Sequence, residues 1–370
     1  MKKFGFGLMR LPTLGEDRSR IDMEHFKKMA DAFLAAGGTY FDTAYPYHGG
    51  FSEVAFREAV VKRYPRDAFT VTDKLPIFRV KETADIQPIF DEQLERCGVE
   101  YFDYYWIHAL SESRYAHAQK VGAFAFLSAK KAEGKIKHIG FSFHDMPEVL
   151  DKILTDHPEV EYVQLQLNYM DWEEPTVRAR ECYEVATAHG KPVIVMEPIK
   201  GGTLANLPQE AERLLKQQAP DASPASWAVR YAASLDNVMM VLSGMSNMEQ
   251  MEDNLSYMQD FRALNAAEME TIENVTKVIR SRIAVACTGC RYCITENACP
   301  RDIQIPDLFE MYNEMKMYNK QRPVGVYQHL TTDHGKASDC ISCGMCEKHC
   351  PQHLPIRKHL QEVAEIMEKA

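Results

Sequence analysis

Eight of the ten cysteines fall in two tight groups near the end of the chain. The first group, CTGCRYCITENACP, contains Cys287, Cys290, Cys293 and Cys299, and the second, DCISCGMCEKHCP, contains Cys340, Cys343, Cys346 and Cys350. Each group has three cysteines separated by two residues and a fourth that precedes a proline. Soft thiolates at this spacing suit [4Fe–4S] clusters.

The fourth cysteine of such a group commonly binds the neighbouring cluster, so we expect crossed ligation. One cluster is assigned to Cys287, Cys290, Cys293 and Cys350, and the other to Cys340, Cys343, Cys346 and Cys299. Zinc is the alternative, because pairs of cysteines two residues apart are also good zinc ligands. A zinc site uses two such pairs, whereas each group here has a triplet, and the pattern therefore favours iron–sulfur.

A second set of reactive side chains follows three apolar segments in the first third of the chain. Asp42 and Tyr47 come with the segment 39–44, Lys74 ends 68–74, and His108 ends 102–108. An ammonium group that a carboxylate fixes favours the ionised form of a neighbouring tyrosine, and a tyrosine tuned in this way can protonate a carbonyl oxygen as hydride arrives. A histidine can donate a hydrogen bond to the same oxygen. This chemistry is carbonyl reduction, and Tyr45, the other tyrosine in the loop, is assigned to packing or substrate contact.

These residues need a scaffold of parallel strands. Apolar strand-like segments alternate with helical patterns at 4–9, 39–44, 68–74, 102–108, 138–142, 162–167, 192–197 and 238–244. Eight such units most economically close into a (β/α)8 TIM barrel, whose reacting groups lie where strands end. An open doubly wound sheet is the alternative, but no G-x-G-x-x-G follows a strand.

The pattern changes at about residue 261 to helix, cysteine group, helix, cysteine group, helix. We therefore expect an α/β barrel domain at 1–265 and a small, mainly helical, ferredoxin-like [4Fe–4S] domain at 266–370. The two remaining cysteines, Cys97 and Cys182, lie in helical segments beside apolar neighbours and are expected in the core.

Composition excludes several classes of function. The chain has 370 residues, 45% of them hydrophobic, and a formal net charge of −10. It lacks the basic footprint of nucleic-acid-binding proteins. It contains no 18-residue apolar run, and MKKFGFGLMRLP has no continuous apolar segment of a signal peptide. We expect a cytoplasmic protein with no nucleic-acid or membrane partner.

The blocks FDTAYPYHGGFSE, VTDK and YYWIHA resemble the active-site blocks of the aldo/keto reductases, over roughly residues 4–260. The resemblance implies a catalytic tetrad of Asp42, Tyr47, Lys74 and His108, with Tyr47 as the general acid. It also implies NAD(P)H binding along the barrel mouth by Gly7, Met9, Arg10, Ser142, Gln164, Met196, Pro198, Lys200, Gly244, Ser246, Gln250 and Asn254. The cysteine-rich end resembles a two-cluster bacterial-type ferredoxin module, which some bacterial and archaeal aldo/keto reductase-like proteins carry.

Two departures from the family pattern bear on the dinucleotide. Phe143 replaces the amide expected after Ser142, so one contact to the nicotinamide is missing. The segment 244–254 carries Glu249, Glu252 and Asp253 but no Arg or Lys, whereas a 2′-phosphate is best held by a cationic group. The choice between NAD and NADP stays open.

Three functions combine a hydride site with one-electron clusters. The first is an NAD(P)H-dependent reductase of a small carbonyl substrate, in which the clusters hold or dock the C-terminal part. The second is a reductase whose clusters bring electrons from a ferredoxin or another electron-transfer partner. The third is a non-catalytic subunit that senses redox state. The intact tetrad favours the first.

Overall fold

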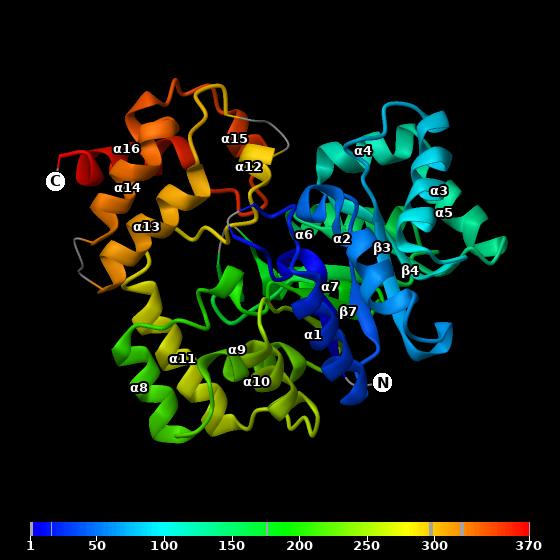
Figure 1. Cartoon of the computed structure of the whole chain (residues 1–370), viewed down its shortest axis with the longest axis horizontal. Coiled ribbons are helices and arrows are strands. Elements are labelled where there is room, and N and C mark those ends of the chain that lie inside the picture. The colour runs from blue at the N-terminus through cyan, green and yellow to red at the C-terminus, as the bar shows by residue number, and fades with distance from the viewer. Residues whose placement is uncertain (1–2, 16, 175–176, 296–298, 319–321, 370) are drawn as a thin grey trace. The chain divides into compact units, whose positions relative to one another are not determined.

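The computed structural model describes residues 3–15, 17–174, 177–295, 299–318 and 322–369 (Figure 1). Eight parallel strands form a closed barrel in chain order, β1-β2-β3-β4-β5-β6-β7-β8. Their bounds are β1 Phe4–Gly7, β2 Tyr40–Asp42, β3 Thr70–Leu75, β4 Phe102–Leu110, β5 Ile136–Phe143, β6 Tyr162–Gln166, β7 Val193–Met196 and β8 Val238–Gly244. Each strand overlaps the segment predicted for it, so the barrel prediction is confirmed and the open sheet is wrong.

Helices follow the strands and cover the barrel. They are α1 Met23–Ala35, α2 Ser52–Phe56, α3 Ile86–Cys97, α4 Glu112–Lys120, α5 Ala123–Ala132, α6 Pro147–Asp156, α7 Ala179–Ala188, α9 Pro224–Ala233 and α10 Met248–Met258. The remaining helices are α8 Gln209–Gln218, α11 Ala266–Arg280, α12 Tyr292–Thr295, α13 Ile305–Tyr318, α14 Arg322–Asp333, α15 Met345–Lys348 and α16 Ile356–Met367.

Helix α1 shows how the sequence builds this outer layer. Asp22 caps the helix by accepting a hydrogen bond from the backbone N–H of His25 at 3.1 Å, which satisfies one of the unpaired donors at its start. Phe33 is fully buried and packs against Phe6 of β1 and Phe41 of β2, with ring centroids 5.8 and 5.2 Å apart. Burial of each such ring stabilises the fold by roughly 1.5–3 kcal/mol.

Strand alternation decides which side chains fill the barrel and which reach its mouth. Side chains two residues apart in a strand share a face, so Tyr40 inside the barrel implies that Asp42 also points inward. Tyr104 and Trp106 share the interior cluster with Tyr40. Gly140 leaves room for Trp106, since a Cβ there would lie 2.4 Å from the indole ring. The inner residues just above this layer are therefore polar groups at the carboxyl ends of the strands.

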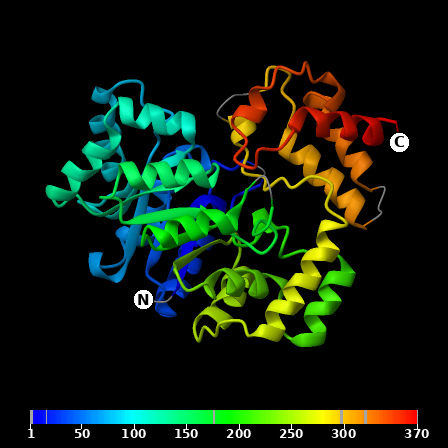
Figure 2. The same cartoon turned by 180° about the vertical axis from the view of Figure 1, so that it is seen from behind.

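The chain forms two compact units, which do not follow chain order. The barrel unit is Met1–Trp172, Arg178–Pro198 and Ala225–Leu264, and the C-terminal unit is Glu173–Val177, Ile199–Pro224 and Asn265–Ala370. Helix α8 belongs with the C-terminal unit because it packs beside α11, as Figure 2 shows in green and yellow. The domain limits of 1–265 and 266–370 stay a prediction.

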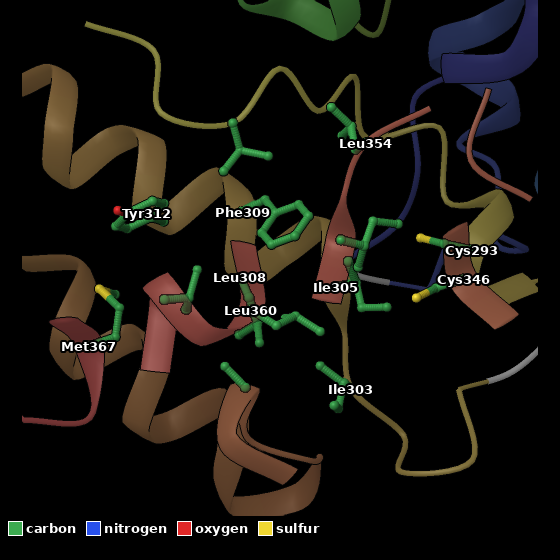
Figure 3. Close-up of a cluster of buried hydrophobic side chains, with 14 of the residues drawn as sticks. Cys293, Ile303, Ile305, Leu308, Phe309, Tyr312, Cys346, Leu354, Leu360 and Met367 are labelled. Atoms are coloured by element: carbon green, nitrogen blue, oxygen red, sulfur yellow. The ribbon is translucent and has the colours of Figure 1, made fainter. Parts of the chain in front are cut away.

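The C-terminal unit has a hydrophobic core of its own (Figure 3). Leu308 and Phe309 of α13 and Leu360 of α16 lie in it, each at most 1% exposed. Two helices, α13 and α14, lie between the cysteine groups, where the sequence pattern predicted one. Pro323 is the second residue of α14, and proline is tolerated in the first turn of a helix but not in the interior of one.

Within the described ranges, no helix is long and apolar enough to span a membrane.

Candidate active site and metal centre

A buried ion pair lies at the carboxyl ends of β2 and β3. Lys74 Nζ is 2.6 Å from Asp42 Oδ1 and donates a second hydrogen bond to the carbonyl oxygen of Thr43 at 2.7 Å. The side chains of Lys74 and Asp42 are 1% and 5% exposed. Gln164 of β6 donates to the other carboxylate oxygen of Asp42 at 3.2 Å. The predicted pairing of this lysine with this carboxylate is therefore present.

Tyr47 and His108 flank the ion pair. Lys74 Nζ lies 5.0 Å from the centroid of the Tyr47 ring. The ring centroids of Tyr47 and His108 are 6.2 Å apart in an edge-to-face arrangement, and the Phe78 ring lies 5.6 Å from His108. The structure thus brings together all four residues of the predicted tetrad.

The phenol of Tyr47 is held in its protonated form. Burial, and after it the carboxylate charges of Asp42 and Glu197, raises the pKa of Tyr47 well above its usual value of 10. The sequence-based expectation was the opposite, namely that the Lys74 ammonium favours the phenolate. Burial and the nearby carboxylate charges therefore outweigh any effect of the Lys74 ammonium on the phenol. A protonated Tyr47 is a proton donor at neutral pH.

His108 is held neutral. Burial, and after it the charges of Lys74 and Arg114, lowers the pKa of His108 well below 6.5. A neutral imidazole has one N–H to donate and is a hydrogen-bond donor instead of a cation. Burial also raises the pKa of Asp42, although Lys74 opposes this shift.

Two residues near Tyr47 have other tasks. The Tyr45 hydroxyl donates to Glu92 on α3 at 3.2 Å, and the Arg96 guanidinium lies 4.7 Å from the Tyr45 ring. The geometry agrees with packing for Tyr45. His48 Nε2 accepts from the backbone N–H of Leu11 at 3.0 Å, so His48 joins the loop after β1 to the tetrad loop.

Residues predicted to bind NAD(P)H meet where β1 and β8 end. Gly7 pairs with Gly244 in the parallel ladder. The turn Leu8–Arg10, which includes Met9, follows β1, and the Ser246 hydroxyl donates to the carbonyl oxygen of Arg10 at 2.7 Å. The loop before α10 and the turn after β1 therefore form one continuous edge.

The start of α10 supplies polar groups for a ligand. Gln250 Oε1 accepts from the backbone N–H of Ser246 at 2.7 Å, and Asn254 Nδ2 donates to the carbonyl oxygen of Gln250 at 2.6 Å. Asn254 is 5% exposed, and its Oδ1 has no partner within the described part of the chain. A buried acceptor of this kind fits a ligand that offers an N–H or O–H group.

Ser142 and Gln164 are neighbours in the β5–β6 ladder and are both buried. The Ser142 hydroxyl accepts from the backbone N–H of Ala109 at 2.6 Å and still has its own proton to donate. Phe143 packs against Phe141, with ring centroids 6.3 Å apart, and supplies only apolar contact.

The predicted dinucleotide residues after β7 are divided between the two units. Met196 and Pro198 belong to the barrel unit, and Lys200 belongs to the C-terminal unit. Between them, Glu197 Oε1 lies 3.8 Å from Arg10 Nη2, which is a long, partly exposed ion pair. The barrel unit alone therefore contains every predicted dinucleotide residue except Lys200.

Sequence reasoning missed a buried polar network behind the tetrad. Glu53 Oε2 is 2.8 Å from Arg96 Nε, and Gln93 donates to Glu53 at 3.2 Å and to the carbonyl oxygen of Lys74 at 3.0 Å. Asp73 accepts from the backbone N–H of Lys74 at 2.8 Å. The available signal was the position of Asp73, a carboxylate at an outward-facing place in a barrel strand.

The second cysteine group encloses a hollow together with one residue of the first group. The cysteines that line the hollow are Cys299, Cys340, Cys343 and Cys346. These are the four residues of one predicted crossed ligand set. Thiolates around a hollow of this kind fit a cubane cluster.

The thiols of the other predicted set act on one another electrostatically. Helices α12 and α15 lie side by side, and their Cys293 and Cys346 side chains point toward the core that contains Ile305 (Figure 3). Burial raises the pKa of Cys293, and the thiols of Cys290, Cys287 and Cys350 add to this effect. In the described residues, no three His, Cys, Asp or Glu side chains converge as ligands of a single metal ion.

Both parts of the chain match known families. The sequence model of the aldo/keto reductase family matches residues 3–277, and that of a 4Fe-4S dicluster domain matches residues 286–354. These matches confirm both resemblances. No curated protein matches the chain.

Solved structures share the barrel. The aldo-keto reductase AKR11C1 from Bacillus halodurans in its holo form is 24% identical, with a TM-score of 0.60 over 74% of this chain and 91% of that one. Its apo form is 25% identical, with a TM-score of 0.56 and the same shares. An aldo-keto reductase from Klebsiella pneumoniae in complex with NADPH is 19% identical, with a TM-score of 0.61 over 74% of this chain and 90% of that one.

Proposed function

The chain belongs to the aldo/keto reductase family, and we propose that it reduces an aldehyde or a ketone with NAD(P)H. The observation that carries this proposal is the buried Lys74–Asp42 pair at 2.6 Å with Tyr47 and His108 beside it. Carbonyl reduction needs a proton donor and an oxyanion stabiliser at one point, and this arrangement supplies both.

Each member of the tetrad has a separate task. NAD(P)H, when bound, supplies the hydride. The Tyr47 hydroxyl donates its proton to the carbonyl oxygen, and the neutral His108 donates a hydrogen bond to the same oxygen. Lys74, held by Asp42, places a positive charge near the ring of Tyr47 and stabilises the phenolate that proton transfer leaves.

The dinucleotide site is proposed along the edge formed by β1, β5, β6, β7 and β8. Its residues in the barrel unit are Gly7, Met9, Arg10, Ser142, Gln164, Met196, Pro198, Gly244, Ser246, Gln250 and Asn254, and Lys200 of the C-terminal unit is the further residue that the family resemblance implies. A similar barrel binds NADPH, which supports a nicotinamide dinucleotide here. The residues 244–254 have no basic side chain, so both NADH and NADPH need to be assayed.

The eight grouped cysteines are proposed to hold two [4Fe–4S] clusters with crossed ligation. The protein is proposed to be cytoplasmic. The shared hollow of Cys299, Cys340, Cys343 and Cys346 supports this assignment. It also supports a second candidate function, in which a ferredoxin or a similar carrier feeds electrons through the clusters to the barrel site. The exposure of Cys343 favours this second candidate, because a partner can approach that ligand.

The first test is turnover by anaerobically reconstituted protein. We expect it to oxidise NADH or NADPH in the presence of an aldehyde or ketone from a broad panel. Tyr47→Phe should lower kcat by about 10²- to 10⁴-fold, the usual contribution of a general acid, without weakening dinucleotide binding. Tyr45→Phe is the matched control and should keep most activity, since that hydroxyl bonds to Glu92. Absence of turnover with every carbonyl and both dinucleotides contradicts the proposal.

The second candidate is tested with a different electron donor. If the clusters feed the barrel site, reduced ferredoxin or a low-potential dye should drive carbonyl reduction without NAD(P)H. Cys343→Ser should then abolish that activity, and full dye-driven turnover after loss of the cluster excludes this candidate. A protein that binds no dinucleotide and turns over with neither donor would contradict both candidates and leave the redox-sensing subunit as the hypothesis to test.

A further inference from the structure

The loop of residues 341–345 lies at the surface of the C-terminal unit, over the hollow that Cys299 and the second cysteine group line. Ile341 is 59% exposed and Met345 is 37% exposed. Cys343, between them, is also exposed. By contrast, Cys346 in the same hollow is only 8% exposed. One edge of this cysteine set therefore faces solvent, with a large apolar side chain on each side of it.

The backbone holds these side chains outward. Ser342 has φ +55° and Gly344 has φ +72°, so the loop turns sharply on both sides of Cys343. The Arg357 guanidinium donates to the carbonyl oxygen of Ser342 at 3.4 Å. A non-glycine residue with positive φ is uncommon and persists only where its surroundings fix it. The backbone conformation of the loop therefore keeps Ile341 and Met345 exposed.

The surroundings of this apolar edge are basic. The charged residues that line the hollow are Arg301 and Arg357. The segment 336–358 carries four basic residues against two acidic ones, in a chain whose formal net charge is −10. Both acidic residues are engaged locally. Glu347 binds Arg357 at 2.8 Å, and Asp339 lies 3.9 Å from Arg301 and accepts from the backbone N–H of Lys336 at 2.9 Å. The two arginines are thus paired with these carboxylates, and the excess positive charge of the segment comes from its exposed lysines, which include Lys336 and Lys348.

We propose that the 341–345 loop and its basic surroundings dock an acidic one-electron carrier protein. This inference rests on the proposed cluster of Cys299, Cys340, Cys343 and Cys346. The cluster, when bound by these cysteines, would accept one electron from the reduced carrier, so the carrier would be oxidised and the cluster reduced by one electron each. Encounters between electron-transfer proteins bury little surface, which fits a patch built on two apolar side chains.

Charge complementarity selects the partner. An acidic carrier is attracted by the net positive charge of the segment 336–358, while the negatively charged remainder of the chain discourages binding elsewhere. Ile341 and Met345 supply the apolar contact that excludes water at the point of transfer. The two features together explain why a cluster ligand, Cys343, is placed at the surface.

The experiment uses the full chain, reconstituted without oxygen, and a purified acidic two-[4Fe–4S] bacterial ferredoxin as the probe. Titration calorimetry measures the binding of the oxidised probe, and stopped-flow absorbance measures the oxidation of the reduced probe. We expect the bimolecular rate to fall steadily as salt concentration rises, because surface charges are screened. Ile341→Glu should lower both affinity and rate about tenfold by placing like charge in the contact.

A matched variant separates docking from general charge effects. Val326 on α14 is 48% exposed and belongs to the same unit, so Val326→Glu adds the same charge at a comparably exposed apolar site. It should change affinity and rate less than twofold. Arg301→Gln should reduce the salt dependence of the rate, because a rim charge acts mainly on association.

Several results would overturn the docking proposal. These are equal effects of Ile341→Glu and Val326→Glu, a rate that rises with salt, or self-association of the chain that Ile341→Glu abolishes. Iron and sulfide content is measured on the same samples. Lack of iron contradicts the proposed clusters, whereas unaltered probe binding by Ile341→Glu contradicts the docking site, and the two failures are therefore distinct.

Discussion

Gly201 and Thr288 are in direct contact within the C-terminal unit, and a Cβ on Gly201 would lie 2.1 Å from the carbonyl oxygen of Thr288. Thr288 is 3% exposed and follows the proposed cluster ligand Cys287. Gly201 follows Lys200, a predicted dinucleotide residue. The turn after β7 is thus packed directly against the first cysteine loop. We therefore expect a substitution that shifts the backbone of one segment to shift the other as well.

Gly201→Ala should therefore disturb the first cysteine loop. The backbone carbonyl of Thr288 has to move away, which displaces Cys287 and Cys290 on either side of it. We expect the iron content per chain to fall by about half, the share of one of two [4Fe–4S] clusters. Iron and sulfide assays and the EPR spectrum of the reduced protein measure this loss.

Gly190→Ala is the matched control for Gly201→Ala. Gly190 has nearly the same backbone conformation, φ +65° against +66°, but nothing lies within 4 Å of its Cβ position. It should cost about 1–2 kcal/mol of stability from the strained backbone alone and leave the iron content unchanged. If both variants keep their iron, the contact does not position the cluster ligands.

The barrel and the tetrad were predictable because they depend on short-range rules. Strand alternation places Asp42 above Tyr40 and His108 above Trp106 on the inner face, and parallel strands bring their carboxyl ends to one mouth. The Lys74–Asp42 contact follows from these two rules and from charge. The cysteine groups were also recognisable from the sequence, because the spacing of the cysteines indicates iron–sulfur ligation without any knowledge of the fold.

Long-range packing was not predictable from the same patterns. The contact between Gly201 and Thr288 joins residues 87 positions apart in the sequence. No pattern in either segment predicts this contact. The direction of the pKa shift of Tyr47 was also not predictable from the sequence, because it depends on the combined effect of burial and several nearby charges. The assignment of α8 to the C-terminal unit depends on its packing against α11.

Lys74→Met tests the energetic coupling of the tetrad. It leaves the Asp42 carboxylate buried with only Gln164 as a donor. Breaking a buried pair in this way should destabilise the fold by about 3–5 kcal/mol. The free energy of unfolding in urea measures the cost, and activity should be lost as well.

The double variant Lys74→Met with Asp42→Asn completes a cycle. Without a buried charge, it should recover at least half of the stability that Lys74→Met loses, while remaining inactive. A double variant whose loss equals the sum of the two single losses would mean that the two groups do not interact, contrary to their 2.6 Å contact.

Asp73→Asn tests the buried carboxyl network through pH. Burial, and after it the charge of Glu53, raises the pKa of Asp73 well above 3.8. The folded protein therefore keeps a proton that the unfolded chain releases. This contribution to stability is complete below the unfolded pKa and is lost as pH rises toward the folded pKa, by about 1.4 kcal/mol per pH unit.

Asparagine at position 73 has no proton to lose in this range. The free energy of unfolding of Asp73→Asn should therefore increase relative to that of the native sequence between pH 5 and pH 8, because only the native protein loses stability over this range. The exposed Asp67→Asn serves as the control and should show no such trend. A constant difference across this range would show that Asp73 is ionised in the folded protein.

Crossed ligation makes a distinct prediction for the double variant Cys299→Ser with Cys343→Ser. These residues come from different cysteine groups but line the same hollow. If they bind one cluster, the double variant loses only that cluster and should retain about four iron atoms per chain. If each group binds its own cluster, the two substitutions remove one ligand from each cluster, and little iron remains.

The reciprocal pair, Cys299→Ser with Cys350→Ser, gives the opposite result under crossed ligation. Each substitution then removes a ligand from a different cluster, so both clusters should be lost. Local ligation predicts the same loss for this pair, so only the Cys299–Cys343 variant distinguishes the two schemes. The Cys299–Cys350 variant is the control, because it shows that one substitution per cluster is enough to release iron. Retention of iron by the Cys299–Cys343 variant together with its loss from the Cys299–Cys350 variant is the signature of two clusters that exchange their fourth ligands, which makes neither cysteine group a complete site alone.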